Sequence, residues 1–128
     1  MTVSRSSSDP DKVRGFAIEA ARVLADRKLE DVLVLDVREL SDVTEYVVLG
    51  SGNSGRQMKS VATEVEKLGK EMGFPPYRES RDPSITWVVA DFVDVVVHLF
   101  EPQQRAYYDI EELWTGAPRV EWRREDGA

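Results

Sequence analysis

The 128-residue sequence contains no cysteine, only one histidine and no long apolar run. The absence of cysteine excludes disulfides, thiolate metal sites and cysteine nucleophiles. With a single histidine as well, a metal site of nitrogen and sulfur ligands is remote, and we expect no metal and no cofactor. No stretch approaches the roughly 20 apolar residues of a membrane-spanning helix, and residues 1–8 lack the apolar core of a secretory signal. We therefore expect a cytoplasmic protein without membrane contact.

Basic residues are outnumbered, since 17 lysines and arginines stand against 24 aspartates and glutamates and give a formal net charge of −7. A protein that tracks phosphates normally carries a basic patch. We therefore expect no direct DNA binding and at most a minor contact with RNA. An acidic domain is better matched to a basic partner protein, which its electric field would attract and orient.

The order of helix and strand patterns predicts one α/β domain over residues 9–118, with flexible tails at residues 1–8 and 119–128. Ser8 or Asp9 caps a first helix, Asn53 or Ser54 caps a second helix that Gly73 ends, and a last helix follows residue 101. Strands are predicted over residues 32–36, 46–50, 77–79, 87–90 and 95–100. Because several strands follow one another without a helix between them, we expect a mixed sheet of about five strands flanked by helices.

Residues 85–100 carry the strongest strand pattern, because two runs rich in β-branched residues flank a short acidic break at Asp91 and Asp94. The single histidine, His98, lies inside the second run. A polar ring in an apolar strand costs stability unless it finds a partner, so a carboxylate or a backbone group is expected beside it.

Alternation along the second run sorts its side chains onto two faces. Val95, Val97 and Leu99 form a uniformly aliphatic face that is expected to pack on a helix. Val96, His98 and Phe100 form the other face, which mixes an imidazole with apolar groups and suits a partly hydrated interface. In the first run the same alternation groups Trp87, Val89 and Asp91.

The loop at residues 50–55 reads Gly-Ser-Gly-Asn-Ser-Gly, a composition that also occurs in phosphate-binding loops. The Walker pattern requires a lysine after its last glycine, but Arg56 follows here, and a tight turn into a capped helix explains the glycines. The alternative function is that of a nucleotidyltransferase-type enzyme or a nucleotide-binding protein that uses Ser51, Asp91 and Asp94. Its two aspartates face opposite sides of an extended strand unless a turn reunites them, so the alternative is disfavoured but stays open.

Three blocks resemble the Iojap family, also called ribosomal silencing factor S. Residues 45–57 read Glu-Tyr-Val-Val-Leu-Gly-Ser-Gly-Asn-Ser-Gly-Arg-Gln, residues 87–100 read Trp-Val-Val-Ala-Asp-Phe-Val-Asp-Val-Val-Val-His-Leu-Phe, and residues 105–114 read Arg-Ala-Tyr-Tyr-Asp-Ile-Glu-Glu-Leu-Trp. Two departures stand out. Glu45 replaces an aspartate that is common in the family, and Val93 replaces a glycine between the hairpin aspartates, where a valine disfavours a left-handed backbone.

The resemblance implies a regulator of translation and not an enzyme. Family members bind ribosomal protein fourteen of the large ribosomal subunit and obstruct docking of the small subunit, so contact with ribosomal RNA is expected to be minor. The family's fold is similar to that of nucleotidyltransferases, and the free protein is expected to form a homodimer. An apolar hairpin near a sheet edge would favour such self-association.

The residues expected to contact the partner are Trp87, Asp91, His98, Phe100 and Tyr108. Four of them belong to the hairpin and share its mixed face, whereas Tyr108 lies in the last helix. Aromatic side chains dominate the energetic centres of protein interfaces. Asp91 is expected to orient His98 or to meet a basic residue of the partner.

Overall fold

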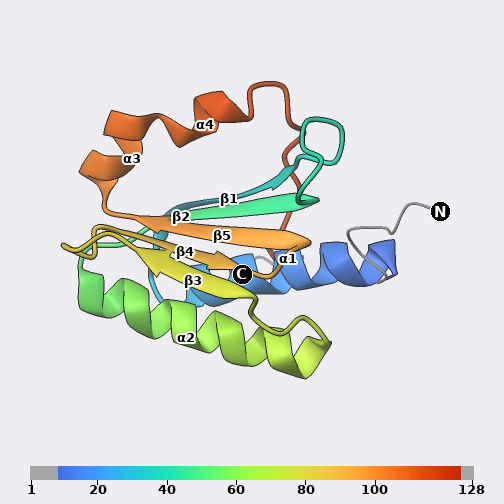
Figure 1. Cartoon of the computed structure of the whole chain (residues 1–128), viewed down its shortest axis with the longest axis horizontal. Helices are drawn as coiled ribbons and strands as arrows, with labels where there is room; N and C mark the ends of the chain where they lie inside the picture. Colours follow the sequence, from blue (N-terminus) through green and yellow to red (C-terminus); the bar gives the residue numbers. More distant parts are fainter. Residues whose placement is uncertain (1–8, 125–128) are drawn as a thin grey trace.

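The computed structural model describes residues 9–124, apart from the side chains of Tyr107 and Tyr108, and forms a five-stranded sheet with helices on both faces (Figure 1). Along the chain the elements are α1 (Pro10–Asp26), β1 (Glu30–Asp36), β2 (Tyr46–Ser51), α2 (Gly55–Met72), β3 (Arg78–Arg81), β4 (Trp87–Asp91), β5 (Val95–Phe100), α3 (Pro102–Tyr108) and α4 (Ile110–Leu113). The mixed α/β sheet predicted from the sequence is confirmed. No helix among the described residues is long and apolar enough to cross a membrane. The remaining terminal residues, 1–8 and 125–128, lie outside the described residues.

The strand order is β1-β2-β5-β4-β3, with β2 and β5 parallel and the other neighbours antiparallel. The β4–β5 hairpin therefore lies inside the sheet, one strand away from the edge strand β3. A strand that is apolar on both faces is most stable where partners cover it on both sides. The short, charged strand β3 takes the edge instead, where its polar side chains disfavour pairing with another chain.

Both long helices begin at predicted capping residues, and α2 also ends where predicted. The Asp9 side chain accepts a hydrogen bond from the backbone N–H of Asp11 at 2.8 Å and caps α1. The Ser54 hydroxyl accepts one from the N–H of Gln57 at 3.1 Å and caps α2. Gly73 ends α2 in the left-handed conformation, with φ of 91°, which glycine adopts without steric cost.

Helices α1 and α2 cover one face of the sheet, and α3 and α4 lie on the other face (Figure 1). Between the sheet and the first pair of helices lies the larger core cluster, in which the ring of Phe16 stacks on Phe74 and meets Phe92 edge-on, each at 5.0 Å between centroids. The smaller cluster lies between the sheet and α4, whose Ile110 is buried. The predicted packing of Val95, Val97 and Leu99 against helices is confirmed.

The last helix departs from the sequence analysis, which predicts one continuous helix. Asp109 adopts a left-handed conformation with φ of 50° and separates α3 from α4. Aspartate tolerates this conformation better than most residues, because its short polar side chain bonds locally. The break changes the direction of the chain between the two short helices, and Ile110 at the start of α4 lies in the smaller cluster.

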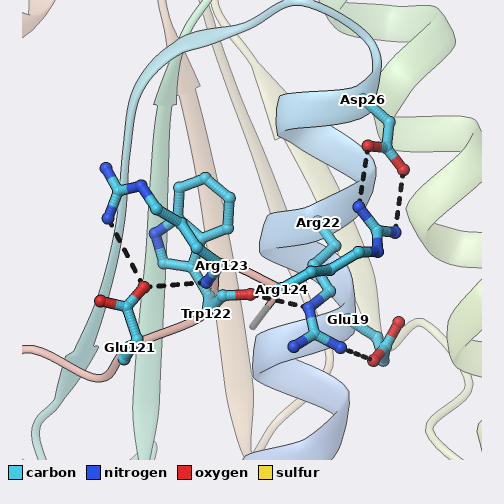
Figure 2. Close-up of polar contacts among 7 residues, drawn as sticks. All are labelled: Glu19, Arg22, Asp26, Glu121, Trp122, Arg123 and Arg124. Atoms are coloured by element: carbon cyan, nitrogen blue, oxygen red, sulfur yellow. Dashed lines mark hydrogen bonds and ion pairs between the residues drawn. The ribbon is translucent and has the colours of Figure 1, made fainter. Parts of the chain in front are cut away.

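The C-terminal segment also differs from its prediction as a flexible tail from residue 119. Val120 is buried, and its N–H donates to the carbonyl of Val34 in β1 at 2.8 Å. The indole Nε1–H of Trp122 donates to the carbonyl of Val32 at 3.1 Å. Figure 2 shows the Arg124 guanidinium held by both carboxylate oxygens of Asp26 in α1. Residues 119–124 therefore belong to the packed domain, because they cover the open edge of β1.

Candidate partner-binding face

The register of the hairpin brings one set of side chains onto the sheet face that α3 and α4 cover only in part. Trp87 pairs with Phe100, Val89 with His98, and Asp91 with Val96. Among these six, only Phe100 is buried, while the others are half-buried. The members of this set, Trp87, Val89, Asp91, Val96 and His98, are called the Trp87 face below.

Phe100, which the sequence analysis also expects to contact the partner, does not belong to this half-buried set. Its side chain is 0% exposed and lies in the cluster that includes Ile110 of α4. The face prediction follows from alternation alone, whereas burial at the end of β5 depends on where the last helices fold back. Phe100 supports the face from beneath, because its ring centroid lies 5.0 Å from that of Trp87.

Trp87 and His98 are joined by a hydrogen bond. The indole Nε1–H of Trp87 donates to Nδ1 of His98 at 3.3 Å, and the imidazole stacks on Phe100 with centroids 5.8 Å apart. Burial of the imidazole lowers the pKa of His98 to about 4, although the negative charge of Asp91 acts in the opposite direction. At neutral pH the ring is therefore uncharged, and its Nδ1 is free of a proton to accept this bond.

Asp82 holds the backbone of Trp87 in place, a role that the sequence analysis missed. One carboxylate oxygen of Asp82 accepts hydrogen bonds from the N–H groups of Thr86 at 2.6 Å and Trp87 at 2.9 Å. The other accepts from the Thr86 hydroxyl at 2.7 Å. The signal was present in the sequence, since an aspartate followed by proline is typical of a turn in which the side chain bonds the backbone ahead of it.

A shallow pocket of about 230 Å³ opens beside the indole. It is lined by Ser80 and Arg81 of β3, by Asp82, and by Trp87 and Val89 of β4. The indole and the valine supply its apolar wall. A pocket next to a half-buried tryptophan can receive one side chain of a partner, which is how the centre of many protein interfaces is built.

Asp91 is not the partner of His98. Its Oδ1 accepts a hydrogen bond from the N–H of Val93 at 2.8 Å, and its Oδ2 lies 3.7 Å from the Arg78 guanidinium in β3. The Arg78 side chain is mostly exposed, so water solvates this ion pair and weakens it. The carboxylate therefore stays accessible to a basic group from outside the chain.

The structure describes the backbone at Val93 and Glu45, the two positions that depart from the family pattern. Val93 adopts φ of 74° in the hairpin turn, so the left-handed conformation is present despite the β-branched side chain. Glu45 is half-buried, and its backbone N–H donates to the carbonyl of Asp94 at 2.9 Å. Tyr108, the remaining predicted contact, ends α3, but its side chain lies outside the described residues.

The three residues named for the enzymatic alternative do not meet. Ser51 ends β2 beside the end of β5, whereas Asp94 precedes β5 and its carbonyl accepts from the N–H of Tyr46, where β2 begins. Five residues of strand separate these ends, a distance of roughly 16 Å. The Ser51 hydroxyl is buried and accepts a hydrogen bond from Arg105 at 2.9 Å. Within residues 9–124, no group of three or more acidic or histidine side chains is placed to hold a metal ion.

Comparison with known proteins shows the family of the chain. The family described as "Ribosomal silencing factor during starvation" matches residues 10–127. The ribosomal silencing factor of Halalkalibacterium halodurans is 36% identical over 102 residues, which is 80% of this chain and 87% of that protein. A mouse protein named "Mitochondrial assembly of ribosomal large subunit protein 1" is 32% identical over 97 residues, covering 73% of this chain and 42% of that protein.

The fold is similar to that of a solved relative. The crystal structure of a protein from Chromobacterium violaceum superposes with a TM-score of 0.73 at 32% sequence identity, covering 94% of this chain and 97% of that one. The nucleotidyltransferase-like topology stays a prediction. The family match spans nearly the whole chain and includes the hairpin that carries the Trp87 face. This chain therefore belongs to the family of ribosomal silencing factors.

Proposed function

We propose that the chain represses translation by binding the large ribosomal subunit through its ribosomal protein fourteen. Bound there, it obstructs docking of the small subunit. The proposal rests on the family, whose name describes silencing of ribosomes. The mouse relative, whose name refers to the large ribosomal subunit, supports the choice of subunit.

The Trp87 face is the surface we assign to this contact. One observation carries the assignment: Trp87 is half-buried and two hydrogen bonds fix its position. Its backbone N–H donates to Asp82, and its indole Nε1–H donates to His98. A side chain fixed before binding loses little conformational entropy when a partner covers it. Asp91 adds a negative charge at the rim, and a formal net charge of −7 would attract a basic ribosomal protein.

The proposed mechanism is steric and involves no turnover and no cofactor. Ser51 lies away from Asp94 and bonds to Arg105, which gives the alternative enzymatic site no common centre. The silencing activity is then proportional to the occupied fraction of large subunits. We place this activity in the cytoplasm, with at most a minor contact to ribosomal RNA.

A homodimer of the free protein is a second part of the proposal. The hairpin is internal to the sheet, so self-association through its edge is not available. The Trp87 face is instead the surface that two copies would share. Binding of ribosomal protein fourteen and dimerisation would then compete, and dilution would favour the ribosome-bound form.

Co-sedimentation tests the assigned partner. Purified protein is mixed with separated small and large subunits, and with isolated ribosomal protein fourteen in a pull-down. We expect retention on the large subunit and on the isolated protein, and none on the small subunit. Retention on the small subunit alone, or on large subunits but not on ribosomal protein fourteen, would overturn the assignment.

A further inference from the structure

A pocket of about 480 Å³ lies along β1, which is the edge strand farther from β4 and its Trp87. Its walls come from the end of α1, the start of β1, the helices α3 and α4, and the C-terminal segment 119–123. A volume in this range fits a small-molecule site. Although the chain is acidic overall, three arginines line this pocket, namely Arg105, Arg119 and Arg123.

The C-terminal wall of the pocket is firmly attached. The carbonyl of Trp122 accepts a hydrogen bond from Nε of Arg22 in α1 at 2.7 Å (Figure 2). Its indole donates to the carbonyl of Val32 in β1. Arg22 is itself paired with Glu19 at 2.7 Å. The pocket is therefore formed by elements that are already tied together, which lowers the entropic cost of binding a ligand there.

Arg105 offers a donor that the protein leaves available. Its side chain is only 9% exposed, with Nε bonded to Glu111 at 3.0 Å and Nη1 bonded to the carbonyl of Asp31 at 2.8 Å and to the Ser51 hydroxyl at 2.9 Å. Within the described part of the chain, Nη2 has no bonded acceptor. The guanidinium is thus fixed in position with one nitrogen left for a ligand.

Two further cationic side chains, those of Arg119 and Arg123, line this pocket. Among the described residues, the Arg119 guanidinium has no ion-pair partner, and the Arg123 guanidinium lies 4.8 Å from the centre of the Trp122 ring. Arg123 also lies 3.5 Å from Glu121, where both side chains are mostly exposed. Forked guanidinium groups that converge on one pocket are the typical recognition elements for phosphate.

The acidic residues of the pocket narrow the choice of ligand. Glu111 is occupied by Arg105, which leaves the Asp31 carboxylate as the free negative charge in the lining. A bare phosphate would be repelled by it, whereas a ligand with N–H donors would bond to it. The half-buried side chain of Leu33 and the ring of Trp122 offer apolar surface to a flat base.

We propose that this pocket binds a phosphorylated nucleotide, with phosphate on the arginines and the base toward Asp31. Guanine is favoured over the other bases, because its N1–H and N2–H₂ groups present adjacent donors to one carboxylate. The inference goes beyond the ribosome-silencing role, since the pocket lies along β1 and β2 separates this strand from the strands β5 and β4 that carry the Trp87 face. It involves binding only and no reaction.

Titration calorimetry on the full chain tests the proposal with GDP, ADP, UDP, inorganic pyrophosphate and a short RNA oligonucleotide as probes. GDP is expected to bind with a Kd below about 1 mM, the weak limit for a specific small ligand. Arg119→Ala is expected to weaken binding roughly fivefold, as for loss of an exposed ionic contact. Arg56→Ala is the matched control, because Arg56 is exposed at the start of α2 and lies outside the pocket lining.

Asp31→Asn tests the base contact separately. Asp31 has φ of 52°, a conformation that asparagine adopts well, so the backbone is retained. The variant is expected to lose the preference for GDP over UDP while still binding both. Absence of GDP binding, equal binding of pyrophosphate and GDP, binding of RNA alone, or equal effects of Arg119→Ala and Arg56→Ala would each overturn the proposal.

Discussion

The indole Nε1 of Trp87 lies 3.3 Å from Nδ1 of His98 and donates a hydrogen bond to it across two neighbouring strands. The single histidine of the chain is thereby explained as the acceptor that fixes the orientation of a half-buried tryptophan. Its own surroundings keep it neutral, because burial lowers the pKa of His98 to about 4. Sequence analysis expects a carboxylate or backbone partner for this ring, and the structure supplies an indole instead.

Replacing Trp87 or Asp91 of the Trp87 face is expected to weaken binding without unfolding the domain. Trp87→Ala and Asp91→Ala should each reduce affinity for the large subunit at least about tenfold, the usual effect of truncating an interface centre. Co-sedimentation measures the affinity, and circular dichroism on the same samples measures folding. Glu64→Ala is the control, because Glu64 lies in α2, on the face of the sheet opposite to the Trp87 face, and pairs with Arg27. Unfolding of the Trp87→Ala variant would show that the tryptophan is a core residue and contradict the surface assignment.

The stability that depends on a neutral His98 is expected to fall in mild acid. The pKa of His98 is about 4 in the folded chain, compared with an ordinary value of 6.5, so the unfolded chain binds more protons between these values. The stabilisation is fully present above pH 6.5 and is lost as the pH falls toward 4. Between pH 7 and pH 5, this predicts a loss of about 2 kcal/mol for the native chain relative to His98→Gln. Urea unfolding of both proteins at the two pH values measures it, and parallel pH dependences would contradict the prediction.

The hairpin turn is expected to become more stable when Val93 is replaced by glycine. Val93 has φ of 74°, a conformation that costs a β-branched residue about 1–2 kcal/mol and costs glycine almost nothing. Part of this gain is offset because glycine makes the unfolded chain more flexible. We expect a net increase in the free energy of unfolding of about 1 kcal/mol for Val93→Gly. A lower midpoint of thermal unfolding would show that the valine side chain contributes more by packing than it costs in strain.

The carboxyl groups of Glu66 in α2 and Glu79 in β3 form a pair. Its pH dependence is opposite to that of His98, because this pair is expected to lower the stability of the fold as the pH rises. Burial and a hydrogen bond with Glu79 raise the pKa of Glu66, so the folded chain holds a proton that the unfolded chain releases earlier. Its stabilising contribution is present below the unfolded pKa and is lost as the pH rises through the folded pKa. Glu66→Gln is therefore expected to raise stability at pH 7 by on the order of half a kcal/mol. Glu71→Gln, on the exposed side of α2, serves as the control, and equal effects of both variants would contradict the pairing.

Local features of the fold could be predicted from the sequence, whereas features set by distant contacts could not. Asp9, Ser54 and Gly73 fix helix ends through bonds to their own neighbours, and these predictions are confirmed. The position of the hairpin within the sheet depends on pairing between β2 and β5, which lie far apart in the chain.

At the candidate site, too, the local pattern could be predicted and the effects of distant contacts could not. Alternation placed Trp87, Asp91 and His98 on one face, as the register confirms. Alternation could not distinguish His98 from Phe100, because only the return of α4 buries the latter. The packing of Val120 against β1 likewise has no local signal, since it depends on the edge left open by the strand order.

The central claim, silencing by steric blockade through the Trp87 face, is tested most directly by light scattering during subunit joining. Separated small and large subunits are mixed after the large subunit has been incubated with increasing amounts of protein. The account predicts that joining falls in proportion to occupancy, without added nucleotide, and that the Trp87→Ala variant fails to reduce it at equal concentration. Unchanged joining at full occupancy of the large subunit would contradict it, as would a magnesium-dependent nucleotide transfer that Asp94→Ala abolishes.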